Sequence, residues 1–172
     1  MTPTLPASLR ADCSQCVGLC CLVPPFDAEQ GFGFDKPAET PCQHLCADHR
    51  CAIHDDLIER GFSGCVAFDC LGAGQRLTAQ AQARFGSAQW RERPEVARWL
   101  MAAYPRMRRV QELLATLTLA AALPGSPGGL SELAAQLAAE APNWPTWSPE
   151  HEATWRDRVR TALAPLADNQ SI

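Results

Sequence analysis

Cysteine is the residue whose number and spacing predict chemistry in this chain of 172 residues. All nine cysteines fall between positions 13 and 70, and most of the sequence follows them. Three of the four histidines lie in the same stretch. Thiolate and imidazole groups bind zinc and other transition metals, and thiolates also hold iron–sulfur clusters. We therefore expect this stretch to bind metal through residues drawn from Cys13, Cys16, Cys20, Cys21, Cys42, Cys46, Cys51, Cys65, Cys70, His44, His49 and His54.

The first four cysteines form a Cys-x2-Cys-x3-Cys-Cys knuckle. A Cys-x2-Cys spacing lets a tight turn direct two sulfur atoms at one ion, and two such pairs complete a tetrahedral site. The adjacent side chains of Cys20 and Cys21 are expected to point apart, so that one ion does not take both. The knuckle therefore predicts more than one metal centre, or ligands shared with the later cysteines, and eight thiolates would suffice for two four-sulfur sites.

Composition limits the classes of function. The net charge is −4 and the isoelectric point is near 5.5, which gives no sign of the dense basic surface that binds nucleic acid. The N-terminal residues lack the apolar core of a signal peptide, and the most apolar run, at 117–123, is too short to span a bilayer. We expect a cytoplasmic protein whose thiols stay reduced. An odd number of cysteines also fits a disulfide framework poorly.

The types of ligand do not identify the metal. A structural zinc scaffold would replace a core that loops cannot make, whereas a functional iron or iron–sulfur centre would add sensing, redox or metal-handling roles. Sulfur ligation suits both. His54 follows Cys51 by three residues and is a weaker candidate ligand than the cysteines, and His44 and His49 are weaker still.

The rest of the sequence predicts a mainly α protein with a loop-rich, metal-stabilised N-terminal half and a C-terminal helical hairpin or bundle. We expect a leader at 1–11, the cysteine-rich region at 12–74 and a helical region at 75–172, with a Pro- and Gly-rich linker at 124–129. A short helix is expected at 52–60. Longer helices are expected at 75–85, at 94–104, from a kink or new start at Pro105 to 123, at 131–141 with Ser131 as its cap, and after the cap Ser148.

The runs DCSQCVGLCC, PCQHL, CAIH, GCVAFDC and FDCLGAGQR resemble the cysteine-rich, zinc- or iron-chelating family described by its CxxCxxCC motif, the YkgJ-like proteins. They are similar above all to the N-terminal region of actinobacterial pentapeptide-repeat proteins. The resemblance covers about residues 12–125. It departs from the family in placing three residues between Cys16 and Cys20, and the pentapeptide repeats are absent. It implies eight metal ligands, with Cys46 as an extra thiol: Cys13, Cys16, Cys20, Cys21, Cys42, Cys51, Cys65 and Cys70.

These observations predict a metal-binding module for zinc or iron, with a structural, sensing or interaction role and no catalytic turnover. One alternative is an iron–sulfur protein that transfers electrons or supports a redox enzyme. Another is an adaptor that binds a protein partner through its tryptophan-rich helices, although the five tryptophans are first expected to pack in the core. No phosphate-binding glycine loop and no nucleophile elbow occurs, so no catalytic residue is nominated.

Overall fold

The computed structural model describes residues 4–168, and in this span it contains helices and no strand. This confirms the mainly α fold class. Positions 1–3 of the expected leader and 169–172 of the expected helical region lie outside the described residues. The α-helices are α1 (Leu19–Leu22), α2 (Ser63–Ala67), α3 (Ala73–Phe85), α4 (Pro94–Ala121), α5 (Leu130–Glu140) and α6 (Pro149–Asp168). The 3₁₀ turns are η1 (Ala7–Leu9), η2 (Cys13–Gln15), η3 (Ala28–Gln30), η4 (His54–Asp56) and η5 (Ala141–Thr146).

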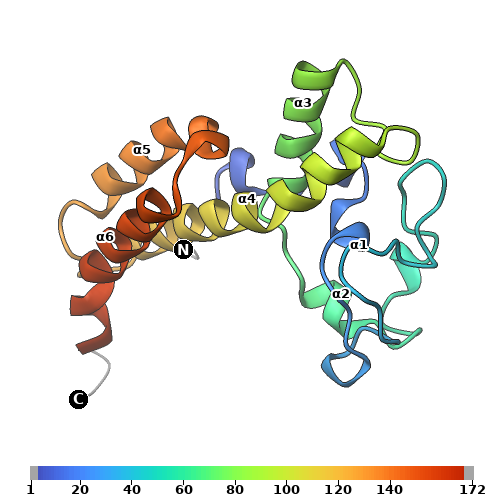
Figure 1. Cartoon of the computed structure of the whole chain (residues 1–172). Coiled ribbons are helices and arrows are strands. Elements are labelled where there is room, and N and C mark those ends of the chain that lie inside the picture. The colour runs from blue at the N-terminus through green and yellow to red at the C-terminus, as the bar shows by residue number, and fades with distance from the viewer. Residues whose placement is uncertain (1–3, 169–172) are drawn as a thin grey trace. The chain divides into compact units, whose positions relative to one another are not determined.

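The chain divides into two compact units, and the boundary falls inside α4. Residues 11–108 form what we call the cysteine-rich unit, whereas residues 4–10 and 109–168 belong to what we call the helical unit. All nine cysteines lie in the first of these. Figure 1 labels the α-helices and colours the chain by residue number. None of the helices in the described part of the chain is long and apolar enough to cross a membrane.

The cysteine-rich unit has a helical framework on which its loops are held. Leu19 and Leu22 of α1 are fully buried, as are Leu77 of α3 and Leu100 of α4. The indole Nε1 of Trp90 donates a hydrogen bond of 2.9 Å to the carbonyl of Val17. Burial of this apolar surface stabilises a unit in which residues 23–62 form turns and two isolated β-bridges.

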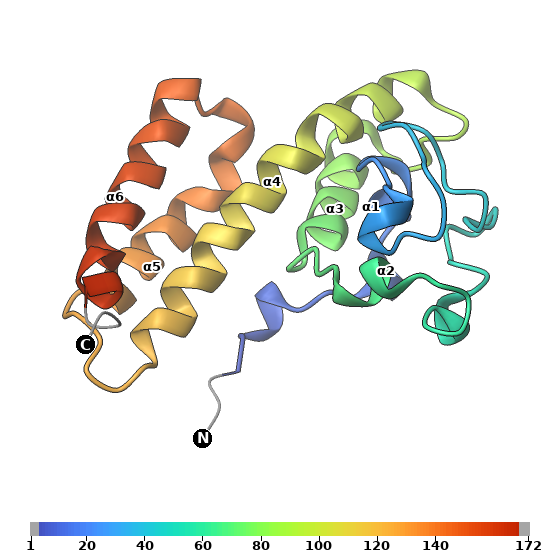
Figure 2. The ribbon, with the colours of Figure 1, turned by 90° about the horizontal axis from the view of Figure 1, so that it is seen from below.

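The helical unit is built from α5, α6 and the C-terminal part of α4, which run beside one another (Figure 2). Its core contains Trp144, Trp147 and Trp155, and the rings of Trp147 and Trp155 stack with their centroids 6.4 Å apart. Trp155 is only 1% exposed. The expectation that tryptophans pack in the core is confirmed for these three residues.

Two local expectations are wrong and a third is narrowed. No regular helix forms at 52–60, where the structure has the short turn η4 followed by further turns, and Ile58 is 64% exposed. Of the kink or new start expected at Pro105, the new start does not occur, because α4 continues through Pro105 with Tyr104 and Met107 buried on either side of it. The N-terminal cap of α5 is Gly129, at a left-handed φ of 87°, so Ser131 falls inside the first turn.

Candidate metal centre

The knuckle is held against the start of α3. The carboxylate of Asp12 caps η2 by accepting a 2.9 Å hydrogen bond from the Ser14 amide. The Asp12 amide in turn donates to the side-chain oxygen of Gln75, at 2.6 Å, and the Val17 amide donates to the hydroxyl of Thr78, at 3.2 Å. These bonds anchor both ends of the Cys-x2-Cys turn on one face of α3.

Cys70 and Gly74 complete this side of the site. The carbonyl of Cys70 accepts a 2.9 Å hydrogen bond from the Ala73 amide, which places Cys70 directly before α3. A Cβ atom added to Gly74 would lie 2.5 Å from the sulfur of Cys16. The absence of a side chain at Gly74 is therefore what lets the Cys16 sulfur approach the helix.

Cys20 and Cys21 lie on the single turn of α1, between two buried leucines. Their sulfur atoms are 4.0 Å apart. The expectation that these side chains point apart is therefore wrong. Two sulfurs bound to one tetrahedral zinc, with Zn–S bonds of about 2.3 Å, would be about 3.8 Å apart. The adjacent pair is thus no argument against a shared ion.

Backbone hydrogen bonds hold the segments that carry the later cysteines, and one of these bonds joins Cys42 to α1. The Cys42 amide donates to the carbonyl of Cys21, at 2.9 Å. An antiparallel bridge between Leu45 and Cys51 then turns the chain back on itself. Cys65 lies in α2, which is tied to the loop at 26–41 by a 2.7 Å bond from the Gly64 amide to the Gly31 carbonyl. These contacts gather thiols that are far apart in sequence.

The thiols on the α3 side influence one another electrostatically. Burial raises the pKa of Cys16 to about 11, against an ordinary value of 9.0, and the charges of Cys20 and Cys70 contribute to the rise. Burial likewise raises the pKa of Cys13, with contributions from the same two thiols. We call this set the α3 thiol group; it consists of Cys13, Cys16, Cys20 and Cys70.

A second set of thiols interacts in the same way. Burial raises the pKa of Cys65 to about 11, and the charges of Cys42 and Cys51 add to it. The pKa of Cys21 is raised first by its hydrogen bond with Cys20 and then by burial, with smaller effects from Cys42 and Cys51. We call this set the loop thiol group; it consists of Cys21, Cys42, Cys51 and Cys65.

Cys20 connects the two groups. A hydrogen bond from Cys21 lowers the pKa of Cys20 to about 7. Its thiolate charge contributes to the raised pKa of members of both groups, after burial or hydrogen bonding as the main cause. Cys20 is therefore the thiol that the fold ionises most readily, and it lies at the junction of the groups.

The proximity of these thiols falls short of a preformed ligand cage. Within residues 4–168, no three histidine, cysteine, aspartate or glutamate side chains are arranged to hold a metal ion. All nine cysteines are free thiols. The backbone thus gathers sulfur donors of the type that zinc and iron prefer, and side-chain rotation between staggered positions would be needed to close them around an ion.

The remaining candidates are Cys46 and three histidines, and two of them interact with the loop thiol group. The pKa of Cys51 is raised mainly by burial and to a smaller extent by charges that include Cys46, and the amide of His44 donates a 3.4 Å hydrogen bond to the sulfur of Cys42. Cys46, the predicted extra thiol, is exposed. The side chain of His54 is 68% exposed and contacts Asp55 at 3.4 Å. The ring of His44 packs edge-on against Phe62, at 5.4 Å between ring centroids. His49 is bonded through Nε2 to the side-chain oxygen of Gln89, at 2.9 Å. None of these contacts directs a histidine ring toward the thiols.

Lys36 is a site residue that the sequence analysis missed. Its side chain is buried, at 4% exposure, and its ammonium group donates to the carbonyls of Pro24 at 2.7 Å and Thr40 at 2.8 Å. In the described part of the chain, no carboxylate lies within ion-pair distance of it. Burial lowers the pKa of Lys36, whereas the charges of Cys42 and Cys21 oppose that shift. The titratable groups whose negative charge would compensate this buried cation are the thiols of Cys42 and Cys21.

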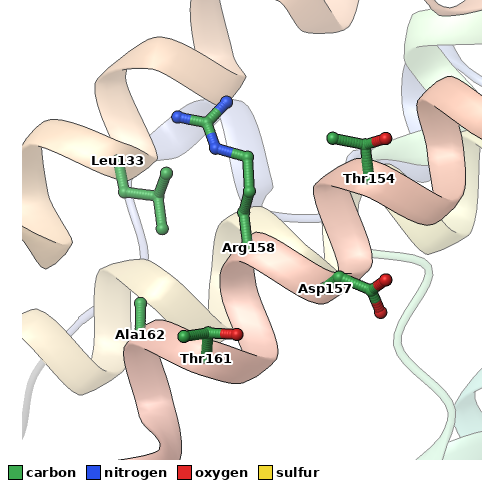
Figure 3. Close-up of a pocket in the computed structure, with 6 residues that line it drawn as sticks. All are labelled: Leu133, Thr154, Asp157, Arg158, Thr161 and Ala162. Atoms are coloured by element: carbon green, nitrogen blue, oxygen red, sulfur yellow. The ribbon is translucent and has the colours of Figure 1, made fainter.

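The helical unit contains an open hollow between α5 and α6, lined by Leu133, Thr154, Asp157, Arg158, Thr161 and Ala162 (Figure 3). Arg158, the cationic residue that lines the hollow, already contacts other side chains. The Arg158 guanidinium donates a 2.6 Å hydrogen bond to Gln136 and lies 4.1 Å from the ring centre of Trp155. The hollow offers no group of catalytic or metal-ligating side chains, so the thiols remain the candidate site.

Fold and site together define a mainly helical protein with a thiol-rich, irregular N-terminal half. The chain is similar to a protein of Bacillus subtilis (strain 168) named "Uncharacterized protein YybG", with 42% identity over 106 residues. This match covers 62% of the chain and only 37% of its relative's length. No family profile matches the chain, and no solved structure matches it. The two proteins are homologous, and the resemblance to the CxxCxxCC family stays a prediction.

Proposed function

We propose that this chain is a metal-binding protein that holds zinc or iron through thiolates of the cysteine-rich unit. The metal stabilises loops whose own core is a small cluster that includes the buried rings of Phe26 and Phe62, and it gives the unit a structural, sensing or interaction role without catalytic turnover. The proposed setting is the cytoplasm, where thiols stay reduced. The proposed ligands are Cys13, Cys16, Cys20, Cys21, Cys42, Cys51, Cys65 and Cys70.

The observation that carries this proposal is the buried ammonium group of Lys36 beside Cys21 and Cys42. A buried charge is costly unless an opposite charge compensates for it. Neutral thiols would leave the ammonium with backbone carbonyls and with the ring of Phe26, whose centre is 4.6 Å away, and neither carries a full negative charge. Thiolates bound to a metal keep negative charge next to it, so a cluster of metal-bound thiolates explains why a lysine is buried there.

The site also fits a metal in its donor type and its shape. Gly74 leaves space for the Cys16 sulfur, and the two sets of four thiols match the number of ligands in four-sulfur zinc and iron–sulfur sites. We assign the α3 thiol group and the loop thiol group to two neighbouring centres. The 4.0 Å separation of the Cys20 and Cys21 sulfurs makes these two residues the point where the centres adjoin or share a ligand.

The test is elemental analysis of protein purified under anaerobic conditions, combined with titration of its accessible thiols. We expect zinc or iron in stoichiometric amount, and protection of all thiols except Cys46 from a thiol reagent. Protein whose thiols have been alkylated after unfolding is the control for adventitious metal. Metal-free protein with nine freely reacting thiols would overturn the proposal.

The same preparation separates zinc from an iron–sulfur cluster. A brown protein with strong visible absorption, iron and acid-labile sulfide would favour the cluster and the electron-transfer alternative. A colourless protein with stoichiometric zinc would rule that alternative out, because zinc has no redox chemistry.

A further inference from the structure

The hydroxyl group of Tyr104, the only tyrosine in the chain, is buried without a hydrogen-bond partner. Tyr104 lies on α4 within the cysteine-rich unit and is 2% exposed. Buried tyrosine hydroxyls usually find a partner, because a buried polar group without one is destabilising. A hydrogen-bond acceptor for this hydroxyl is therefore expected among the groups near it.

The segment that leads to Cys70 lies beside this part of α4, because the Arg108 guanidinium, one turn from Tyr104, is 4.6 Å from the ring centre of Phe68. Burial raises the pKa of the Tyr104 phenol, and Cys20, Cys70 and Cys16 add to the rise in that order, whereas Arg108 opposes it. Three members of the α3 thiol group are thus near enough to act on the phenol, and none of their sulfurs is within hydrogen-bond distance of its hydroxyl in this structure. The two buried neighbours on this stretch of α4, Ala103 and Met107, are apolar and cannot accept a hydrogen bond.

The strength of sulfur as an acceptor depends on its charge. A neutral thiol is a weak acceptor, whereas an ionised acceptor makes a hydrogen bond about twice as strong as a neutral one. A hydroxyl that faces thiols therefore gains a good partner when one of those sulfurs is a metal-bound thiolate. Groups that bond to metal ligands in this way orient the ligands and adjust the charge on them.

We infer that Tyr104 is a positioning residue of the α3 thiol group, whose hydroxyl donates a hydrogen bond to a metal-bound sulfur of Cys16, Cys20 or Cys70. This inference rests on the proposed metal-binding function. It adds a residue outside the cysteine motif, on a different helix, that would help to determine the affinity and the electronic properties of the centre.

The test replaces Tyr104 with phenylalanine and uses Co²⁺ as the probe metal. Y104F removes one hydroxyl and keeps the ring in the core. We expect Co²⁺ affinity to fall by about 10- to 100-fold, as is typical when a group bonded to a metal ligand is lost. The sulfur-to-cobalt charge-transfer absorption should shift, because the thiolate loses a hydrogen bond. A purely structural role for Tyr104 would not change that absorption.

Thermal unfolding adds a second readout. In metal-free protein, Y104F should leave the melting temperature unchanged or raise it, since it removes an unpartnered buried hydroxyl. In Co²⁺-loaded protein the same substitution should lower it. Met107→Leu, in the same part of α4, is the matched control and should leave the absorption unchanged.

The outcomes distinguish the inference from the proposal beneath it. Wild-type protein that binds neither Co²⁺ nor Zn²⁺ would overturn the metal-binding function and the role of Tyr104 with it. Wild-type protein that binds Co²⁺, together with a Y104F variant of equal affinity and identical absorption, would overturn the role of Tyr104 alone. Equal losses of melting temperature with and without metal would also contradict it.

Discussion

The sulfur of Cys16 lies in the space that a side chain at Gly74 would occupy: a Cβ atom there would be 2.5 Å from Sγ. Gly74 is in the first turn of α3 and has an ordinary backbone conformation, so a left-handed φ does not explain the glycine. The explanation is contact between a helix and a thiol. The relationship places Cys16 against α3 and makes residue 74 part of the candidate centre.

The Gly74→Ala variant tests this contact directly. Alanine normally stabilises a helix relative to glycine by about 1 kcal/mol. Here the collision with Cys16 should outweigh that gain and destabilise the protein by roughly 1–3 kcal/mol, the usual range for overpacking, and metal content should fall. Chemical denaturation and elemental analysis would measure both effects.

The controls for this substitution use the same chain. Removing the sulfur in G74A/C16A should recover the stability lost in G74A, although not the metal. Gly128 has open space around the position of an added Cβ, so G128A should change stability by no more than about 0.5 kcal/mol. A G74A protein as stable and as metal-rich as the wild type would show that the sulfur moves aside without consequence.

The exposed thiol of Cys46 should be dispensable for metal binding. Cys46→Ser is expected to retain full metal content, because Cys46 is exposed and is not one of the eight proposed ligands. Cys16→Ser should lose metal, since it removes a proposed ligand that also packs on α3. Equal metal loss in both variants, measured by elemental analysis of freshly purified protein, would show that Cys46 has been wrongly set aside.

Features with a local cause could be predicted from the sequence. The helix expected at 75–85 is α3, and the cap expected at Ser148 is confirmed by the hydrogen bond that its hydroxyl accepts from the His151 amide, at 3.2 Å. Features that depend on tertiary burial could not be predicted. Whether Pro105 would kink a helix or start a new one was left open, because the packing that keeps α4 continuous is not visible in a local pattern.

In the candidate site, too, residues with a sequence pattern could be predicted and residues that matter through burial could not. The cysteines could be nominated because their spacing carries the signal, although no observation yet tests them as ligands. Lys36 and Tyr104 could not be nominated from the sequence, since a single lysine and a single tyrosine form no pattern. Their proposed roles depend on their burial near the thiols. The direction of Cys20 and Cys21 was misjudged because one tight helical turn, α1, brings their sulfurs within 4.0 Å.

The stability of the metal-free protein should depend on pH with a maximum near pH 9. The raised pKa of Cys16, about 11 against an ordinary 9.0, means that the fold favours its neutral thiol. That contribution is present below pH 9 and is lost as the pH rises from 9 to 11. The lowered pKa of Cys20, about 7, acts in the opposite sense: its contribution is present above pH 9 and is lost as the pH falls from 9 to 7.

Thermal unfolding of chelator-treated protein between pH 6 and pH 11 would measure this dependence. Cys16→Ser should flatten the decline on the alkaline side, and Cys20→Ser should flatten the decline on the acidic side. Each unit of pKa difference corresponds to about 1.4 kcal/mol, so the change should be well above experimental error. A stability that does not vary across this range would contradict both assignments.

Replacing Lys36 should have a larger effect on the metal-bound protein than on the metal-free protein. Lys36→Met keeps the apolar stem and removes the buried charge. Without metal the change in stability should be small, because removal of a buried charge that no carboxylate in the described chain compensates offsets the loss of the hydrogen bonds to the carbonyls of Pro24 and Thr40. With metal, the variant should bind zinc more weakly, because negative charge on the thiolates of Cys21 and Cys42 loses its nearby cation.

Competition with a zinc-binding dye and thermal unfolding in both states would measure these effects. Arg60→Met is a suitable control, since its charge is exposed and its pairing with Asp56 is a surface contact. A K36M protein that binds zinc as tightly as the wild type would remove the main support for the proposed function.

Metal removal should loosen the two units to different extents. Excess chelator at neutral pH should speed amide exchange in the cysteine-rich unit, where loops depend on single bonds such as those from the amides of Cys42 and Gly64. Amides of α6 should keep their protection, because that helix is stabilised by its own core, including Trp155 and Val159. Hydrogen exchange followed by mass spectrometry of the full chain would compare the two regions in one sample. Unchanged exchange at 11–74 after complete removal of metal would show that the loops are stable without it.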